Sequence, residues 1–128
     1  MKDFALLFTR LVFGCLMLIN HAIPKLNKLS STPIKFADPL GVGNEISLYL
    51  TLFSEGICSI LLIFGLLTRL ASLPLIFTMS VAAFYIHLDD SLRDKEASLL
   101  YMAAYIILLA FGSGKFSLDK LIRPRAKF

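Results

Sequence analysis

One apolar stretch, Ile46 to Leu67, constrains the fold more than any other part of the chain. Its sequence, ISLYLTLFSEGICSILLIFGLL, is long enough to cross the roughly 30 Å hydrocarbon core of a bilayer as a helix. A single carboxylate, Glu55, lies close to its middle. An ionisable group deep in hydrocarbon costs roughly 2.5 to 3.5 kcal/mol on insertion scales, so it usually faces inward, paired and functional. The first question about this chain is therefore what Glu55 meets.

Further apolar segments accompany this stretch. The segments predict helices over about residues 4–23, 47–67, 70–88 and 97–112, with a long loop over 24–46 and a basic tail over 113–128. With 57% apolar and 17% charged residues and a mean hydropathy of +0.77, the chain is more apolar than a soluble domain of its length. Its charges lie between the segments, which disfavours a soluble four-helix bundle. We predict an all-α fold, a polytopic membrane protein with a four-transmembrane-helix bundle forming one domain over residues 1–128.

The distribution of Lys and Arg predicts an orientation. With both termini on one side, eight of the 13 basic residues share that side and five share the other. The excess of positive charge then places both termini in the cytoplasm. A basic tail beside anionic lipid accounts for the net charge of +4, so we expect a lipid bilayer as partner and no nucleic acid.

Polar and small residues form one stripe along the first predicted helix. Spacings of three or four place the following residues on a common face: Arg10, Gly14, Met17, His21 and Lys25. This face should point into the bundle, and its glycine permits close approach of another helix. Pro24 is expected to end the helix. The connection that follows is longer than an antiparallel pair needs, and it either covers the outer mouth of the bundle or is a floppy interfacial loop.

The second and fourth predicted helices carry similar stripes. In the second helix the stripe comprises Ser47, Thr51, Ser54, Glu55, Cys58 and Ser59. Its hydroxyls either solvate Glu55 or bond the first helix. In the fourth helix the stripe comprises Ser98, Tyr101, Tyr105, Leu108 and Gly112, so two phenols face the interior. Tyr101 lies near the outer surface, where interfacial anchoring and a role in a site are equally compatible with its position.

Depth along the helices predicts which polar residues meet. At 1.5 Å per residue, Arg10 lies about 20 Å and Glu55 about 14 Å below the outer ends of their predicted helices. An arginine side chain can span the difference of about 6 Å, so an ion pair between the two is feasible and would offset much of the cost of both charges. The predicted intramembrane polar site is Arg10, Glu55, His21, Tyr101 and Tyr105, supported by Asn20, Thr51, Ser59 and His87.

Several short patterns in the chain are misleading. Gly112-Ser113-Gly114-Lys115 lacks the full phosphate-loop pattern, so we interpret it as a helix end with a capping glycine, followed by Ser117 as the N-cap of a short helix. His21 and His87 near helix ends are more typical of interfacial polar residues than of metal or haem ligands. The two cysteines lie singly in apolar segments. No metal site is predicted, and no hydrolytic triad is present in the sequence.

Three motifs in order along the chain carry a resemblance. The first motif, R-x3-G followed by H-x3-K, matches Arg10, Gly14, His21 and Lys25, with Ala22 in place of a second glycine. The second, a Glu followed by G-L-x-T-R, matches Glu55, Gly65, Leu66, Thr68 and Arg69. The third, G-x-G-x-x-S-L-D, matches Gly112, Gly114, Ser117, Leu118 and Asp119. With these motifs the chain resembles the DoxX family of small four-helix bacterial membrane proteins over essentially its whole length. The resemblance implies a bundle in the bacterial inner membrane and, in some relatives, a link to quinone, thiosulfate or oxidative-stress chemistry.

Two functions fit these residues. In the first, the protein is a redox-linked component that holds a quinone-like head group between the first, second and fourth helices, anchored by Arg10 and Glu55; the sequence does not identify the cofactor beyond quinone as one option. In the second, it is a non-enzymatic membrane subunit that docks a partner protein through the long loop or the basic tail, or a small permease that works as a homo-oligomer. The sequence leaves open whether any reaction is catalysed.

Overall fold

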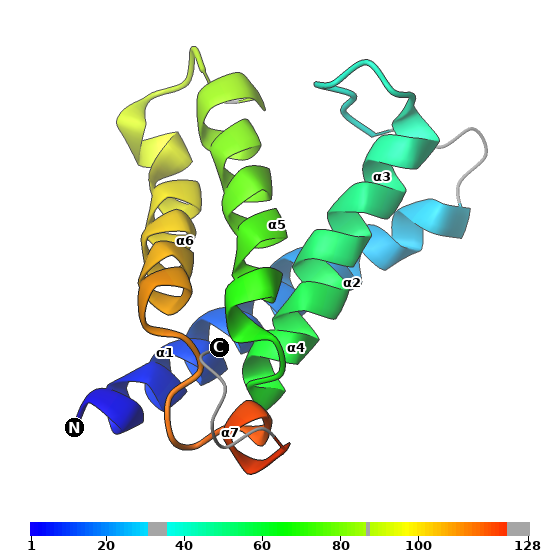
Figure 1. The fold of residues 1–128 in the computed structure, drawn as a ribbon. Helices are drawn as coiled ribbons and strands as arrows, with labels where there is room; N and C mark the ends of the chain where they lie inside the picture. Colours follow the sequence, from blue (N-terminus) through cyan, green and yellow to red (C-terminus); the bar gives the residue numbers. More distant parts are fainter. Residues whose placement is uncertain (31–35, 87, 123–128) are drawn as a thin grey trace.

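The computed structural model describes residues 1–30, 36–86 and 88–122, which form helices and short connections (Figure 1). The first span is continuous from Lys2 to Ser30 and contains α1 (Lys2–Met17), a π-helical turn (Leu18–Ala22), α2 (Ile23–Leu26) and a 3-10 turn (Asn27–Ser30). The second span contains α3 (Asn44–Leu52), a π-helical turn (Phe53–Cys58) and α4 (Ser59–Phe64). The third contains α5 (Thr68–Val81) and a π-helical turn (Ala82–Ile86), and it is followed by α6 (Leu92–Phe111) and α7 (Leu118–Ile122).

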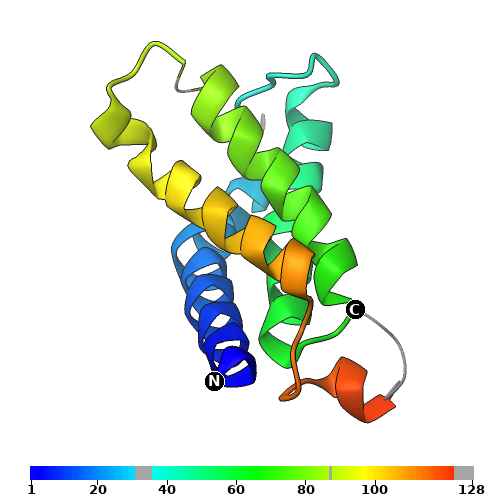
Figure 2. The ribbon, with the colours of Figure 1, turned by 60° about the vertical axis from the view of Figure 1, so that its left-hand side comes forward.

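The chain folds as a polytopic helical membrane protein, as predicted. Three helical stretches, Lys2–Ser30, Asn44–Phe64 and Thr68–Ile86, are long and apolar enough to cross a membrane. The fourth helix, α6, has 20 residues and packs along α5 in both ribbon views (Figures 1 and 2). Large apolar side chains such as Phe8, Phe77 and Phe111 lie more than half exposed on the outside. A soluble bundle would cover such side chains, whereas lipid solvates them.

The bundle has two ends, which we call the terminal end and the loop end. The terminal end holds the N-terminus, the turn between α4 and α5, and α7, while the loop end holds residues 36–43 and the turn between the third span and α6 (Figure 1). The first span and the third run toward the loop end, and the second span and α6 return from it. The core between them is apolar and closely packed, with Met17, Leu62, Leu75 and Leu108 fully buried.

The prediction that Pro24 ends the first helix was wrong. The helix continues to Ser30, and Pro24 lies at the start of α2, directly after a π-helical turn. In that turn the amide of Ile23 bonds to the carbonyl of Leu18, an i to i−5 bond. Because the backbone register is already shifted there, the absent N–H of proline interrupts the helix less than it would in a regular α-helix.

The other helix boundaries differ from the prediction by smaller amounts. The fourth helix begins at Leu92 rather than near residue 97, because Ser91 serves as an N-cap and its hydroxyl accepts a hydrogen bond of 3.3 Å from the amide of Asp94. The charged stretch before the apolar run is therefore helical. Gly112 ends α6 with φ of 79°, and Ser117 caps α7 through a 3.2 Å bond from the amide of Lys120. Both capping predictions for the tail are confirmed.

Candidate functional site

The predicted polar stripes point into the bundle. Arg10 and Met17 on the first span are 1% and 0% exposed, and Glu55 and Ser59 on the second are 2% and 0% exposed. Gly14 allows the close contact expected of it, because a Cβ there would lie 2.8 Å from Cγ1 of Ile63 and 3.3 Å from the carbonyl oxygen of Ser59. The sequence periodicity thus identified the buried faces.

Glu55 pairs with Lys25. The ammonium Nζ of Lys25 donates to both carboxylate oxygens of Glu55, at 2.7 Å to Oε1 and 2.6 Å to Oε2. The side chain of Glu55 is 3% exposed and that of Lys25 is 23% exposed. The carboxylate is therefore deep in the bundle, while the lysine reaches it from the loop end along its apolar stem.

The predicted ion pair between Arg10 and Glu55 was wrong. The depth estimate assumed that the first helix ends near Ile23, but it continues seven residues further, to Ser30. Measured from that end, Arg10 lies about 10 Å deeper than assumed. The same extension makes Lys25 part of the helix, so its side chain is held where it can reach Glu55.

The pair lines a pocket between the second and third spans, with a volume of about 290 Å³. This volume is just below the range of about 300 to 1,000 Å³ that is typical of ligand pockets. Lys25 and Glu55 are the charged residues among those that line it within the described parts of the chain. Most other lining residues are apolar, and they include Phe53, Phe77 and Leu50. An apolar pocket with one charged pair at its inner end is suited to an amphipathic molecule.

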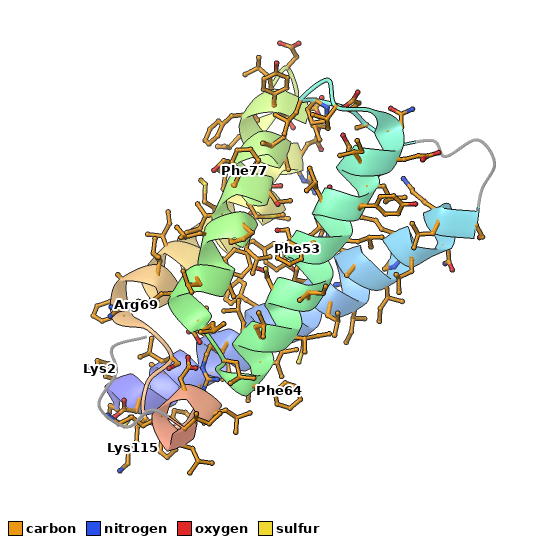
Figure 3. All side chains as sticks on the ribbon, turned by 45° about the vertical axis from the view of Figure 1, so that its right-hand side comes forward. Lys2, Phe53, Phe64, Arg69, Phe77 and Lys115 are labelled. Carbon is orange, nitrogen blue, oxygen red and sulfur yellow. The ribbon has the colours of Figure 1, made fainter. Side chains whose placement is uncertain are left out.

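The walls of the pocket meet at its base. The hydroxyl of Thr78 on α5 donates to Oγ of Ser54 on the second span at 2.7 Å. Toward the loop end α3 and α5 diverge, and Phe53 and Phe77 lie on either side of the space between them (Figure 3). Two of the three π-helical turns supply lining residues, Phe53 to Glu55 and Ala82 with Ile86. A π-helical turn widens the helix locally and is frequent at functional sites.

Residues 36–40 of the long connection cover the pocket on the loop side. Phe36, Pro39 and Leu40 line it, and the ammonium of Lys28 lies 5.2 Å from the centre of the Phe36 ring. Asp38 fixes this segment by accepting bonds of 2.8 Å from Oγ of Ser47 and 2.9 Å from the amide of Gly43. These bonds stabilise the carboxylate and lower the pKa of Asp38 below its usual value. Of the two interpretations of the loop, the described part fits a cover.

Arg10 belongs to a different cluster, at the terminal end. Its guanidinium donates to the carbonyls of Leu62, at 3.2 Å, and Ile63, at 3.5 Å, and also to the carbonyl of Phe116. The first two carbonyls are in the last turn of α4, which ends at Phe64. Carbonyls at a helix C-terminus lack intrahelical donors and carry partial negative charge, so a cation is stabilised there.

Asp119 completes this cluster from α7. Its amide donates to the carbonyl of Gly65 at 3.1 Å, and its carboxylate accepts from the amide of Thr68 at 3.4 Å, at the N-terminus of α5. An anion is favoured at that end of a helix, just as a cation is at the end of α4. Asp119 is 4% exposed and also attracts Arg10 electrostatically. We call Arg10, Gly65, Thr68, Phe116 and Asp119 the terminal clamp.

Gly65 is required in the terminal clamp for two reasons. Its φ of 72° is in the left-handed region, and a Cβ there would lie 2.5 Å from Cβ of Ser117 and closer still to the guanidinium of Arg10. The motif residues of the sequence therefore separate into two groups. Arg10, Gly65, Thr68 and Asp119 hold the terminal end together, while Lys25, Glu55 and His21 lie toward the loop end.

The remaining predicted site residues lie between these groups or outside them. His21 packs edge-on against Tyr101 with ring centres 5.4 Å apart, and Tyr101 stacks on Tyr105 at 6.1 Å. Tyr105 is fully buried, and its hydroxyl has no hydrogen-bond partner among the described residues. Glu55 acts electrostatically on all three. These aromatic side chains adjoin the ion pair but do not line the pocket.

The supporting residues have separate positions. Thr51 lines the pocket and donates to the carbonyl of Ser47 at 2.8 Å. Ser59 is buried, and its hydroxyl is without a partner in the described part of the chain. Asn20 is exposed on the first span. His87 lies outside the described residues.

Sequence reasoning missed Lys25 as the partner of Glu55, and it missed the third span as a wall of the pocket. Lys25 had been placed on the inward stripe, so its spacing from His21 was the available signal. In the third span, Thr78 and Ala82 are small residues four positions apart among larger apolar ones. Such a pair signals close approach of a neighbouring helix, although the spacing alone does not distinguish packing from a pocket wall.

The fold and these two clusters define a polytopic helical membrane protein with a charged pair in its interior. The DoxX family model matches residues 5–88, and the chain belongs to this family. A protein of Haemophilus influenzae described only as uncharacterized is 39% identical over 83 residues, a match that covers 62% of this chain and 55% of that protein. The chain therefore spans about half the length of this relative. No solved structure matches the chain.

Proposed function

We propose that the protein is a redox-linked membrane component that binds a quinone-like head group in the pocket between the second and third spans. The observation that carries this proposal is the ion pair of Lys25 and Glu55 at the inner end of an otherwise apolar cavity. The sequence had suggested a site between the first, second and fourth helices, with Arg10 as an anchor. The pocket moves the proposed site toward α5, and Lys25 takes the place of Arg10.

The chemistry of the pair suits both oxidation states of such a ligand. A quinone presents carbonyl oxygens, which accept hydrogen bonds, and the ammonium of Lys25 can donate to them. A quinol presents hydroxyls, which can donate to the carboxylate of Glu55. A ligand bound at this place would share the donors and acceptors that the two side chains now offer each other. Hydrogen bonds to charged groups in a low-dielectric site are stronger than neutral ones, so the pair can orient the ring.

Ligand identification and titration test this proposal. Protein purified in mild detergent should retain a quinone detectable by mass spectrometry of its lipid extract, and delipidated protein should bind a decyl-substituted para-benzoquinone. Glu55→Gln and Lys25→Met should each weaken binding about tenfold, the loss of one charged hydrogen bond. Glu45→Gln is the matched control, because Glu45 is exposed on α3 outside the pocket lining. A protein that retains no quinone and binds none would rule the proposal out.

One observation favours a second function, docking of a partner protein at the terminal end. The terminal clamp fixes α7 against the bundle, and there Leu121 and Ile122 are 76% and 63% exposed. A non-enzymatic subunit could present this short helix to a partner. Charge reversal at Lys115 and Lys120 should then abolish recovery of a co-purifying partner. Recovery that survives the reversal would exclude docking through this segment.

We also propose that the protein lies in the bacterial inner membrane with both termini in the cytoplasm. Lys2, Arg69 and Lys115 gather at the terminal end (Figure 3), which supports this orientation. At the loop end, Lys25 is neutralised by Glu55. In a variant without Cys15 and Cys58, Asp90→Cys should react with a membrane-impermeant maleimide in intact cells, and Lys2→Cys should react only after lysis. The reverse pattern would invert the orientation.

A further inference from the structure

We propose that the ligand enters the pocket sideways from the bilayer, between α3 and α5, and that it carries a long apolar chain that stays in this opening. The inference rests on the proposed function and specifies its substrate class: a lipid-soluble, single-chain amphiphile with a hydrogen-bonding ring as head group.

Residues 36–40 cover the pocket toward the loop end and are held there by hydrogen bonds, although Leu40 is itself 50% exposed. Phe36, Pro39 and Leu40 lie across it. Asp38 accepts bonds from the amides of Val42 and Gly43, just before α3, and from the hydroxyl of Ser47 in α3, at 3.0, 2.9 and 2.8 Å. The ring of Phe36 is held in addition under the ammonium groups of Lys25 and Lys28, at 6.0 and 5.2 Å from its centre. A water-soluble ligand that approached from this side would have to displace several bonds.

The pocket is also closed at its base and behind. The hydrogen bond between Thr78 and Ser54 joins its two walls, and Thr78 donates in addition to the carbonyl of Pro74 at 2.8 Å. Behind the walls, Lys25 and Glu55 occupy the side that faces the first span. Among the described residues, the side between α3 and α5 that faces away from the bundle is the one without such a closure.

The lining residues on that side are apolar and exposed. Leu50 is 52% exposed, Phe53 48% and Phe77 57%, although all three line the pocket. Phe53 and Phe77 project from opposite walls (Figure 3). They lie within spans that cross the bilayer, so the solvent at this opening is acyl chain rather than water. A ligand with a ring inside and a chain in the opening would bury apolar surface along its whole length.

The experiment maps the chain directly. A para-benzoquinone whose alkyl chain ends in a diazirine is added to the native protein in phospholipid vesicles and photolysed, and the labelled residues are found by mass spectrometry. Labels at Leu50, Phe53, Phe77 or Val81 that excess decyl-substituted quinone suppresses are expected. Suppressible labels at residues 36–40 would overturn lateral entry while leaving the proposed function in place. Binding of no quinone at all would overturn both.

A pair of variants provides an independent measurement. Ala82 lines the pocket on the third span, and Ala82→Trp should obstruct it and weaken binding of the decyl-substituted quinone about tenfold. Ala103→Trp is the control, because Ala103 is exposed on α6 outside the pocket lining. The same ring with a methyl group in place of decyl should bind more weakly than the decyl compound at equal membrane concentration. Equal binding of the two rings, with no effect of Ala82→Trp, would contradict the inference.

Discussion

The two charged clusters of this protein each stabilise a charge buried in the helix bundle, but they do so with different groups. Arg10 is 1% exposed; its guanidinium donates to backbone carbonyls at the end of a helix and is attracted by the buried carboxylate of Asp119, while its Nε has no partner among the described residues. Glu55 is satisfied by one long side chain that reaches in from the loop end, next to a cavity. Backbone carbonyls at fixed positions make a cluster rigid, whereas a lysine stem can rearrange when a ligand arrives. We therefore assign a structural role to the terminal clamp and a ligand-binding role to the ion pair of Lys25 and Glu55.

Arg10→Met should have the largest effect on stability. The substitution leaves the carbonyls of Leu62, Ile63 and Phe116 without their shared donor and removes the positive charge that attracts Asp119, at a cost of about 3 kcal/mol or more. Folded yield and the midpoint of unfolding in a mild detergent titrated with dodecyl sulfate measure this loss. Arg10→Lys should recover part of it, because the charge is retained without the planar fork. Full stability of Arg10→Met would show that the clamp is not structural.

Gly65→Ala should be the next most damaging change. It combines a positive φ with a collision against Ser117 and Arg10, whereas Gly41→Ala shares the φ of 72° and has no atom of the described residues within 4 Å of the added Cβ. We expect about 1 kcal/mol for Gly41→Ala from backbone strain, and at least about 1 kcal/mol more for Gly65→Ala from overpacking. The difference between the two unfolding midpoints isolates the packing of the clamp. Equal unfolding midpoints would mean that α7 shifts to accommodate the Cβ added at Gly65 without a loss of stability.

Replacing both residues of the ion pair together should test whether the pair serves ligand binding rather than stability. Lys25→Met with Glu55→Leu removes both charges, and replacement of a buried pair by apolar side chains is often neutral or stabilising. We therefore expect the double variant to be within about 1 kcal/mol of the parent in stability, yet to lose quinone binding. Thermal unfolding and ligand titration on the same preparation separate the two effects. Loss of folding in the double variant would give the pair the structural role that we assign to Arg10.

The smallest expected effect concerns the cover of the pocket. The pKa of Asp38 is lowered in the folded protein, so its contribution to stability is present above the ordinary Asp pKa of about 3.9 and is lost as the pH falls through the folded value. The unfolding midpoint should therefore decline more steeply on acidification below about pH 4 in the parent than in Asp38→Asn. Identical acid profiles would show that these bonds do not hold the cover. The effect is small because the Asp38 carboxylate is only partly buried and water screens its interactions.

Periodicity predicted the buried faces of the helices but not which residues meet. Most residues of the stripes in the first, second and fourth helices are buried, because one face of each helix must be removed from lipid to bury its polar groups. Pairing failed because it depended on where the first helix ends, and the π-helical turn before Pro24 changed that end. Such turns have no reliable sequence signal, and each one shifts the register of every residue beyond it.

The pocket was less predictable than the fold. Its charged residues were on the stripes, but its walls depend on how α3 and α5 diverge above the bond between Ser54 and Thr78. Helix crossing is set by side-chain packing over the whole interface rather than by any one motif. In the terminal clamp, by contrast, the residues that meet belong to motifs already visible in the sequence. The motifs at Arg10, Gly65 and Asp119 are distant in sequence, and their convergence explains why these residue types occur together in one chain.

The partners of Arg10 also impose an order on biosynthesis. Leu62, Ile63 and Phe116 are separated from Arg10 by 52, 53 and 106 residues, so the ribosome makes them long after the first span. That span must enter the membrane with an arginine whose acceptors do not yet exist, a penalty of roughly 2.5 to 3.5 kcal/mol on insertion scales. The first span therefore carries this cost until residues 116–119 have been made, and only the nearly complete chain can neutralise it.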